Sequence, residues 1–478
     1  MSNKAEFIVE DRKIQVSNLD KVLYPKVGFT KGQVIDYYVR IAPVLLPHLE
    51  DRPLTMKRYP NGVDAEFFYE KNCPSHRPKW VKSAKVWSEG NNKTMNYCLA
   101  QDLPTLVWAA NLADLELHTS LAKKKDVALV RVRTGDGHEG WGQVAPYHAD
   151  ITALVLHRQV APHVLGQDDG DLTALGERVM EREHKFPGSH LVRALGGVDT
   201  ALWDLQGKRA GRPVCELIGG SVRPLAVYAS SMRRDIEPAE EAARLAGLQD
   251  RRGYRAVKFR IGRECGNDRD EWPGRTEAVV PAVRRAVAEG TALLVDANSC
   301  YTPAKAIEVG RMLQDEGVRH FEEPCPYWEQ EWTAEVAAAL DLDVTGGEQD
   351  CLLTTWRRML WLRAVDVAQP DVCYLGGLTR TLRVARMAAE AGLPVVPHSA
   401  NLSLVTVFSL HLMAAIPNAG PYVEFSIEPG SYYPWQRGLF DPGLIVEDGM
   451  VAVPAGPGWG VDIRPGWLAR AERRISAL

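Results

Sequence analysis

A repeated pattern of short apolar runs, each ending in a polar or charged residue, constrains this sequence most strongly. One such run occupies residues 293–295 and ends at Asp296. The steps between the chemically useful residues are 26, 26, 23, 27 and 26 residues, along the series Asp296, Glu322, Glu348, Asp371, His398 and Glu424. A strand, a loop, a helix and a return loop need roughly that length. The pattern therefore predicts parallel strands alternating with helices.

The same pattern favours a closed barrel over an open sheet. An open, doubly wound sheet would give a similar step, but it would spread these polar residues along a line. A closed barrel gathers the carboxyl ends of all its strands on one rim, where active sites of this architecture lie. Carboxylates and an imidazole gathered on one rim would form an active site. We therefore expect a closed barrel over residues 225–430.

Composition limits the class of protein. The chain has 478 residues, 45% hydrophobic and 25% charged, with a net charge of −4. This is ordinary globular usage for two or three domains, with no general drive toward nucleic acid. The start of the chain lacks an apolar signal core, and no apolar run approaches a membrane span. We expect a soluble, cytoplasmic protein that does not bind membranes.

The eight cysteines show no C-x-x-C pair. Closely spaced cysteine pairs are typical of zinc sites and of redox motifs, and many short secreted domains carry a disulfide framework. This long chain has no closely spaced cysteine pair. The sequence therefore predicts reduced thiols and neither a disulfide framework nor a zinc site.

The first part, residues 1–126, is rich in Lys, Pro and aromatic residues. Thr30 is a candidate cap for a helix over residues 33–45, and a strand from Arg52 is expected to end at the turn 60–62. Phe67, Phe68 and Tyr69 precede Lys71, a mixture that suits stacked bases and phosphates. A basic strand edge with core aromatics is the commoner explanation of such a composition.

Motifs in this part resemble the primase-like polymerase domain of the bacterial end-joining DNA ligases, the ligase D family. The resemblance covers residues 10–126 and rests on the segments 17–21, 30–32, 52–54, 58–62 and 115–118. It implies a partial α+β domain that contacts DNA. In the family, two aspartates of a later Phe-Asp-Leu-Asp-Pro-type strand hold the catalytic metals. Here residues 123–126 run into an unrelated segment, so two-metal nucleotidyl transfer lacks its ligands and polymerase activity is not expected.

The second part begins with a predicted hairpin. Residues 129–134 alternate in polarity, turn at 135–137 and are answered by a strand at 140–143. A helix is expected over 192–205, where apolar residues fall at helical spacing. The tail after residue 431 is rich in Gly and Pro with short strand-like runs, which suits a return to the small sheet near the hairpin.

Motifs spread over about 350 residues are similar to those of the enolase superfamily, in its mandelate racemase subgroup. They are the segments 140–142, 201–204, 217–220, 258–260, 296–298, 322–324, 347–348, 369–371 and 397–399. The resemblance implies a modified TIM (β/α) barrel, residues 225–430, under an α+β capping domain, residues 127–224 and 431–478. It also implies abstraction of the proton α to a carboxylate through an enediolate, with Mg²⁺ as cofactor. A homo-oligomer is expected.

Three carboxylates at successive strand ends are the candidate metal ligands. Asp296, Glu322 and Glu348 supply the hard oxygen donors that Mg²⁺ prefers. The alternative is that each pairs with an arginine or caps the following helix. Glu323 follows Glu322 on an alternating strand, so we expect it to point away from the metal.

The candidate proton-transfer residues come after Glu348 in the same series of repeats. His398, one repeat after Asp371, is typical of an imidazole oriented by a carboxylate and acting as a general acid or base near neutral pH. A lone histidine is more often structural, but the paired aspartate favours catalysis. The resemblance alone places Glu424 as an electrophilic carboxylic acid near the substrate carboxylate.

Position 260 departs from the subgroup, whose usual motif is Lys-x-Lys. Lys258 and Arg260 share one side of a strand. A guanidinium has essentially no neutral form to accept a proton. Racemisation needs bases on both faces of the substrate, whereas dehydration can use one acid/base set. The sequence therefore favours a sugar-acid dehydratase in which Arg260 holds substrate oxygens. Lys258 could still act as a base, and a salt bridge from this pair to Asp296 is the structural alternative.

Family members begin with a strand and a mobile lid ahead of the hairpin. In this chain the polymerase-like segment stands in their place, so the capping domain is expected to be incomplete. The leading hypothesis is a Mg²⁺-dependent aldonate or aldarate dehydratase. A racemase or epimerase of the same superfamily, and a fusion that binds DNA ends through residues 10–126, are the alternatives.

Overall fold

The computed structural model describes residues 4–49, 52–88, 93–119, 127–430, 432–436 and 438–477. The chain separates into two compact units, Met1–Lys123 and Lys124–Leu478. The boundary expected at residue 126 lies among residues 120–126, outside the described ranges. The finer division of the second unit into capping domain and barrel remains a prediction. No helix in the described residues is long and apolar enough to cross a membrane.

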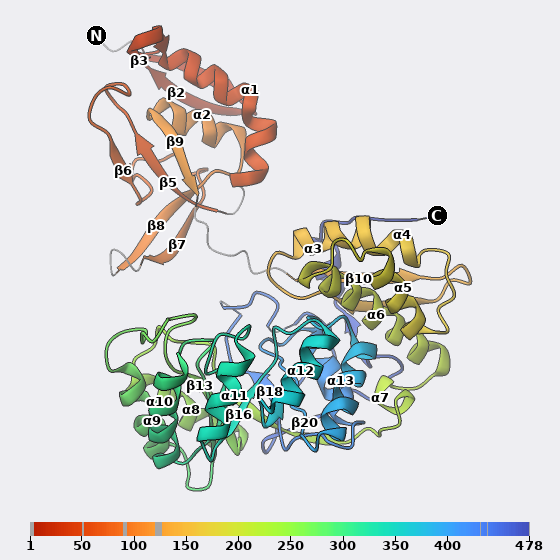
Figure 1. The fold of residues 1–478 in the computed structure, drawn as a ribbon. Helices are drawn as coiled ribbons and strands as arrows, with labels where there is room; N and C mark the ends of the chain where they lie inside the picture. Colours follow the sequence, from red (N-terminus) through yellow and green to blue (C-terminus); the bar gives the residue numbers. More distant parts are fainter. Residues whose placement is uncertain are drawn as a thin grey trace. The chain divides into compact units, whose positions relative to one another are not determined.

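The first unit is an α+β fold in which two helices lie against strands (Figure 1). Its elements are β1 (Lys4–Val9), β2 (Arg12–Ser17), β3 (Val22–Tyr24), a 3₁₀ turn (Pro25–Val27), β4 (Phe29–Thr30), α1 (Lys31–Leu49), β5 (Pro53–Arg58), β6 (Phe68–Glu70), β7 (Ser83–Ser88), β8 (Lys93–Leu99), α2 (Leu103–Asn111) and β9 (Asp114–Thr119). Strand β5 pairs with β6, β8 and β9 in one antiparallel sheet. Buried side chains of α1 and α2 pack on these strands.

The start of α1 agrees with the predicted cap. The Thr30 N–H donates to Gln33 Oε1 at 2.7 Å, and the Gln33 N–H donates to Thr30 Oγ1 at 3.4 Å. These reciprocal bonds satisfy two of the backbone donors that a helix start leaves free. The helix extends four residues beyond the predicted end, to Leu49.

The prediction of reduced thiols is wrong for one pair, because Cys73 and Cys98 form a disulfide. Their separation of 25 residues gave no sequence signal. The Cys73 N–H donates to the carbonyl of Asn96, which brings the segment before β7 against β8. Among the other described cysteines, residues 215, 300, 325, 351 and 373 are free thiols.

The second unit begins with the expected hairpin of β10 (Leu129–Arg133) and β11 (Glu139–Gln143). Helical segments follow, namely α3 (Ala149–Val155), a π-helical turn (Leu156–Val160), α4 (Ala161–Val164), α5 (Leu172–Arg182), α6 (Ser189–Ala210) and α7 (Val214–Leu217). Helix α6 packs directly on β11. A Cβ atom added at Gly140 would lie 2.0 Å from the Ala201 carbonyl oxygen, so this close approach requires glycine.

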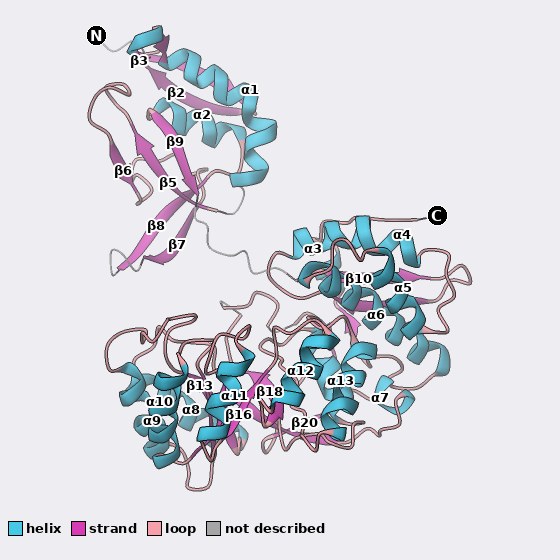
Figure 2. Cartoon of the chain, in the orientation of Figure 1, coloured by secondary structure: helices cyan, strands magenta, loops and turns pink. Residues whose placement is uncertain are grey.

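A parallel sheet forms the barrel, and helices surround its strands (Figures 1 and 2). Its strands are β12 (Pro224–Ser230), β13 (Ala256–Arg260), β14 (Ala292–Asp296), β15 (Val318–Glu322), β16 (Asp343–Gly346), β17 (Val367–Ala368) and β18 (Val423–Ser426). The helices are α8 (Pro238–Arg252), α9 (Arg275–Ala286), α10 (Pro303–Asp315), α11 (Gln330–Ala339), α12 (Leu353–Leu362), α13 (Leu378–Glu390) and α14 (Leu404–Met413). The predicted modified (β/α) barrel is confirmed.

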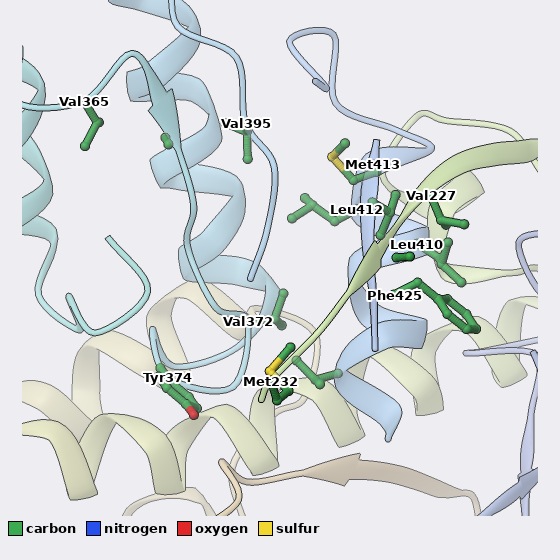
Figure 3. Close-up of a cluster of buried hydrophobic side chains, with 14 of the residues drawn as sticks. Val227, Met232, Val365, Val372, Tyr374, Val395, Leu410, Leu412, Met413 and Phe425 are labelled. Carbon is green, nitrogen blue, oxygen red and sulfur yellow. The ribbon is translucent and has the colours of Figure 1, made fainter. Parts of the chain in front are cut away.

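Further parallel pairings extend the sheet at both ends of this strand order. Strand β18 pairs in parallel with β12, and single parallel bridges join Ala368 to Val395 and Val395 to Ala419. The core between strands and helices is apolar. Figure 3 shows Leu410 and Leu412 of α14 beside Val227 of β12 and Phe425 of β18.

The tail does not return to the hairpin sheet as expected. Its strand β20 (Met450–Ala452) pairs antiparallel with β12 of the barrel, and β19 (Phe440–Asp441) pairs with β21 (Asp462–Ile463). A short helix, α15 (Pro465–Leu468), follows. The tail contacts the capping region without joining its sheet: Trp459 bonds Asp204 and the Thr200 carbonyl of α6, and Ser476 Oγ lies 2.6 Å from His157 Nδ1. A strand-like run of three residues can pair with several sheet edges equally well. The sequence pattern therefore did not identify β12 as the strand with which β20 pairs.

Candidate active site

The predicted site residues lie where the barrel strands end, and all are buried. Lys258 and Arg260 are on β13, while Asp296, Glu322 and Glu424 are on β14, β15 and β18. The other three follow strands or a barrel bridge, in the order Glu348, Asp371 and His398. Parallel pairing in register sets Arg260 opposite Asp296 and Asp296 opposite Glu322. The strand repeat thus brings distant residues to one rim.

Lys258 lies at the centre of the carboxylates. Its Nζ is 2.7 and 2.9 Å from the two Glu322 oxygens, 2.8 Å from Glu424 Oε1 and 3.7 Å from Asp296 Oδ2. Burial by itself lowers the pKa of this ammonium, but Glu322 and Glu424 outweigh it and raise the pKa. In this arrangement Lys258 is a fixed positive charge and not a free base.

Arg260 is also fully engaged. Its Nη1 bonds the Asp296 carboxylate and donates to Asn298 Oδ1 at 2.8 Å. Its Nε donates to the Ser231 carbonyl at 3.2 Å, and Nη2 contacts Met232 Sδ at 2.9 Å. The salt bridge to Asp296 that the sequence left open is therefore present. A guanidinium held on every side supplies charge in a fixed position.

His398 and Asp371 form the expected pair. Asp371 Oδ2 lies 2.7 Å from His398 Nδ1, and its other oxygen accepts the N–H groups of Cys373 and Tyr374. His398 Nε2 lies 3.3 Å from Glu348 Oε2. Burial lowers the pKa of the imidazole, but Glu348 and the hydrogen bond with Asp371 together raise it to about 10, above the near-neutral range expected from the sequence. Asp371 fixes the ring so that Nε2 is the nitrogen available for proton exchange.

Glu424 is anchored as a carboxylate. It accepts hydrogen bonds from Ser230 Oγ at 2.7 Å and from the Ser399 N–H at 2.6 Å, in addition to its ion pair with Lys258. Burial by itself raises the pKa of Glu424. The positive charges of Lys258 and, next in size, His398 outweigh burial and lower the pKa to about 2. In this arrangement Glu424 accepts hydrogen bonds and has no proton to donate to a substrate. Its role as an acid remains a prediction from the resemblance.

Glu323 does not face away from the site, contrary to expectation. Strand β15 ends at Glu322, and Glu323 takes a positive φ of 41° that turns the chain, so strict alternation no longer applies. Burial first, and then Glu348 and Glu322, raise its pKa well above the ordinary value. Asn298, whose Oδ1 accepts from Arg260, donates through Nδ2 to Glu323 Oε2 at 3.4 Å, so this carboxyl group borders the site.

The donor types at the rim fit a divalent cation. Asp296, Glu322, Glu323 and Glu348 offer buried oxygens, the ligands that Mg²⁺ prefers. Among the described residues, however, no three acidic, cysteine or histidine side chains are arranged around one point as metal ligands. In this arrangement Lys258 and Arg260 bond the oxygens of Glu322 and Asp296.

Several residues of the site were not predicted. Gln369 Nε2 donates to Glu322 Oε2 at 2.9 Å, and Asn298 bonds Arg260. Tyr147, in the loop after β11, has a positive φ of 65°, and its hydroxyl lies 3.3 Å from that of Tyr433. Gln369 and Asn298 stand within the quoted motifs, which offered a signal. The tyrosines are in loops without a periodic pattern, which offered none.

Comparisons with known proteins agree with this geometry. Residues 239–467 match the profile described as "Enolase C-terminal domain-like", and residues 106–219 match the mandelate racemase / muconate lactonizing enzyme N-terminal domain. A D-galactarolactone cycloisomerase of Agrobacterium fabrum is 30% identical over 351 residues, covering 70% of this chain and 88% of the relative. This chain belongs to the enolase superfamily. Its place is in the mandelate racemase and muconate lactonizing enzyme branch.

Other superfamily members extend the comparison. An arabinonate dehydratase of Saccharolobus solfataricus is 28% identical, covering 71% of this chain and 89% of the relative. The crystal structure of a candidate racemase from Roseobacter denitrificans is 60% identical with a TM-score of 0.73, covering 74% and 97%. The L-talarate dehydratase of Polaromonas sp. JS666, complexed with Mg and L-glucarate, is 26% identical with a TM-score of 0.64, covering 73% and 92%.

The first unit has a different relative. Residues 30–133 match the profile of the LigD primase-polymerase domain. The end-joining protein LigD of Mycolicibacterium smegmatis is 42% identical over 106 residues. That match covers 22% of this chain but only 14% of the relative. The resemblance predicted for this segment is confirmed, and it concerns a small part of a much longer protein.

Proposed function

We propose that the second unit is a Mg²⁺-dependent dehydratase of an acid sugar, an aldonate or an aldarate. The observation that carries the proposal is the asymmetry of the site. One imidazole, His398, is backed by a carboxylate, whereas position 260 on β13 carries a guanidinium that cannot accept a proton. The acid-sugar dehydratases among its relatives support this assignment.

Asp296, Glu322 and Glu348 are the residues that would hold Mg²⁺. When bound there, the ion would supply Lewis-acid stabilisation of the negative charge that develops on the substrate carboxylate. Lys258 and Arg260, buried beside two of these ligands, add fixed positive charge at the same place.

Proton transfer falls to His398. In its neutral form the imidazole takes the α proton at Nε2, and the C–H electron pair moves into the carboxylate to give an enediolate. That pair then forms the Cα=Cβ bond as the bond from Cβ to its hydroxyl breaks. The hydroxyl leaves with the proton returned by His398, so one water is lost. The resulting enol tautomerises to a 2-keto-3-deoxy acid. Asp371 keeps Nε2 oriented and stabilises the imidazolium throughout.

A panel of aldonates and aldarates with Mg²⁺ tests the proposal. We expect one or more members to give a 2-keto-3-deoxy acid, measured by semicarbazide absorbance. His398→Asn should reduce the rate at least about 100-fold, since general acid–base catalysis contributes roughly 10²- to 10⁴-fold. The surface variant His138→Gln, with 52% of its side chain exposed, is the matched control. Folded protein that dehydrates no member of the panel would overturn the proposal.

A racemase or epimerase is the second candidate, favoured by the 60% identity to the Roseobacter protein. It would need Lys258 as the second base, although Glu322 and Glu424 hold that residue in its charged form. Proton NMR in D₂O separates the two reactions. An epimerase incorporates deuterium at Cα without losing water, whereas a dehydratase forms product deuterated at C3.

For the first unit we propose contact with a 5′-phosphorylated DNA end. Lys57 Nζ lies 4.3 Å from the Phe67 ring centre, and an open cavity of about 510 Å³ is lined by residues including Tyr69, Lys71 and His118. Cations beside exposed aromatic rings suit phosphates and stacked bases. Affinity measured by fluorescence anisotropy should fall steeply between 50 and 200 mM salt. Equal indifference to DNA and to a neutral competitor would exclude this contact.

A further inference from the structure

Helix α6 packs on the start of α13, which follows the barrel strand β17. Asp199 of α6 accepts the Thr379 N–H at 3.2 Å, and Trp203 Nε1 donates to Thr379 Oγ1 at 2.9 Å. Thr379 is the second residue of α13, so these bonds hold α6 against the chain that leaves the barrel rim. The same helix carries Arg193, which is half-buried and bonds a rim residue.

Arg193 is connected to a candidate metal ligand through one amide. Its Nη2 donates to Gln349 Oε1 at 3.1 Å, and Gln349 Nε2 donates to Glu348 Oε1 at 3.0 Å. A guanidinium can only donate hydrogen bonds, so it holds the Gln349 oxygen and turns the NH₂ group of the amide toward Glu348. Glu348 Oε1 is thus held by Gln349, while Oε2 lies 3.3 Å from His398 Nε2.

Arg193 also lies over an aromatic ring that borders the candidate base. Its Cζ is 3.5 Å from the ring centre of Tyr374, which is 5.7 Å from the ring centre of His398. The Tyr374 N–H donates to Asp371 Oδ1 at 2.9 Å, and Asp371 is the carboxylate that orients His398. A cation is attracted to the face of an aromatic ring. The guanidinium therefore holds the ring that packs beside the imidazole.

We propose that Arg193 is a positioning residue that keeps Glu348 and His398 in place. It acts on the metal ligand through Gln349 and on the imidazole through Tyr374. This role rests on the function proposed above, and it extends the site to a residue outside the barrel. Side chains that hold a metal ligand from behind typically contribute roughly 10- to 100-fold to metal affinity or activity.

Metal affinity measured without substrate tests the connection through Gln349. Electron paramagnetic resonance of free Mn²⁺ gives the Kd of the full-length protein for Mn²⁺, the probe of the proposed Mg²⁺ site. Arg193→Met and Gln349→Leu should each raise this Kd about 10-fold. The double variant should bind Mn²⁺ no more weakly than Gln349→Leu, because both changes break one connection. Arg209→Met removes an ion pair near the other end of α6 and, as the matched control, should keep the wild-type Kd.

Steady-state kinetics at saturating Mg²⁺ test the contact with Tyr374. The rate is expressed per Mn²⁺-binding site, so that unfolded protein does not lower it. Arg193→Met should lower kcat for dehydration about 10-fold and leave KM within about twofold of wild type, because the base moves while the substrate contacts remain. Arg193→Lys should recover part of kcat, since an ammonium is also attracted to the ring face.

The outcomes separate this role from the reaction itself. Arg193→Met with the Kd and kcat of wild type would overturn the role of Arg193 alone. If that variant does not fold, Gln349→Leu tests the same connection from the barrel side, and a wild-type Kd there would overturn it. Wild type that binds Mn²⁺ but dehydrates no acid sugar would remove the proposed reaction, and the comparison of Kd values would still decide the connection. Wild type that binds no Mn²⁺ would overturn the metal site and this role together.

Discussion

The buried histidine of helix α14 should make the second unit sensitive to acid. His411 is fully buried, and both ring nitrogens are engaged. Its Nδ1 accepts the Cys215 N–H at 3.0 Å, and its Nε2 donates to the Trp459 carbonyl at 3.1 Å. Burial lowers the pKa of this imidazole from 6.5 to about 4, although the bond to Trp459 acts in the opposite direction. The ring therefore joins α14, α7 and the tail in its neutral form.

The direction and size of the effect follow from proton linkage. The unfolded imidazole takes up a proton near pH 6.5 and the folded one only near pH 4, so acid favours unfolding in this window. Stability from this residue is complete above pH 6.5 and falls as the pH is lowered. At pH 5 the loss is about 2 kcal/mol, because one pKa unit corresponds to about 1.4 kcal/mol.

His411→Gln isolates this contribution. A glutamine can accept from Cys215 and donate to Trp459, but it does not titrate. Urea unfolding of the second unit, followed by near-UV circular dichroism at pH 7 and pH 5, gives the free energy of unfolding. Between pH 7 and pH 5 this free energy should fall by about 2 kcal/mol more in wild type than in the variant. The surface variant His138→Gln should behave as wild type. Equal losses in wild type and His411→Gln would refute the reasoning.

Three further predictions concern other parts of the chain. Asp114 is buried, and burial raises its pKa to about 8, so the stability that its neutral form supplies at low pH is lost as the pH rises from about 4 to 8. Asp114→Asn should therefore stabilise the first unit at pH 7, on the order of 3 kcal/mol in urea unfolding, while exposed Asp64→Asn should not. Arg260→Lys should lower kcat/KM for dehydration about 10-fold or more, because an ammonium cannot reproduce the guanidinium contacts; an unchanged rate would count against a fixed-charge role. Gly347→Ala should lower the Tm by several degrees, since its Cβ would lie 2.4 Å from the Trp356 ring at a φ of +107°; an unaltered Tm would contradict this packing.

The sequence predicted the structure correctly where a regular spacing of residues determines the fold. The steps between Asp296 and Glu424 reflect a strand and a helix per unit, and parallel pairing then places the strand ends at one rim. The pairing of His398 with Asp371 followed from the same spacing. Short-range signals also succeeded, as at Thr30, because a helix cap depends on neighbours only three residues away.

Features decided by distance in space were not predictable. The disulfide from Cys73 to Cys98 depends on how two segments pack. The ion pair from Lys258 to Glu322 depends on which buried charges lie within reach of each other. The predicted orientation of Glu323 was wrong because this residue has a positive φ, which ends the strand alternation. The residue types around it give no sign of that turn.

A crystal structure of the protein with Mg²⁺ and a sugar acid would show whether the three carboxylates and His398 act on one substrate. We expect one ion bonded to oxygens of Asp296, Glu322 and Glu348 at about 2.0–2.1 Å, with His398 Nε2 facing the α carbon of the acid. Carboxylates that remain on Lys258 and Arg260, with the ion bound elsewhere and the imidazole turned from the substrate, would contradict it.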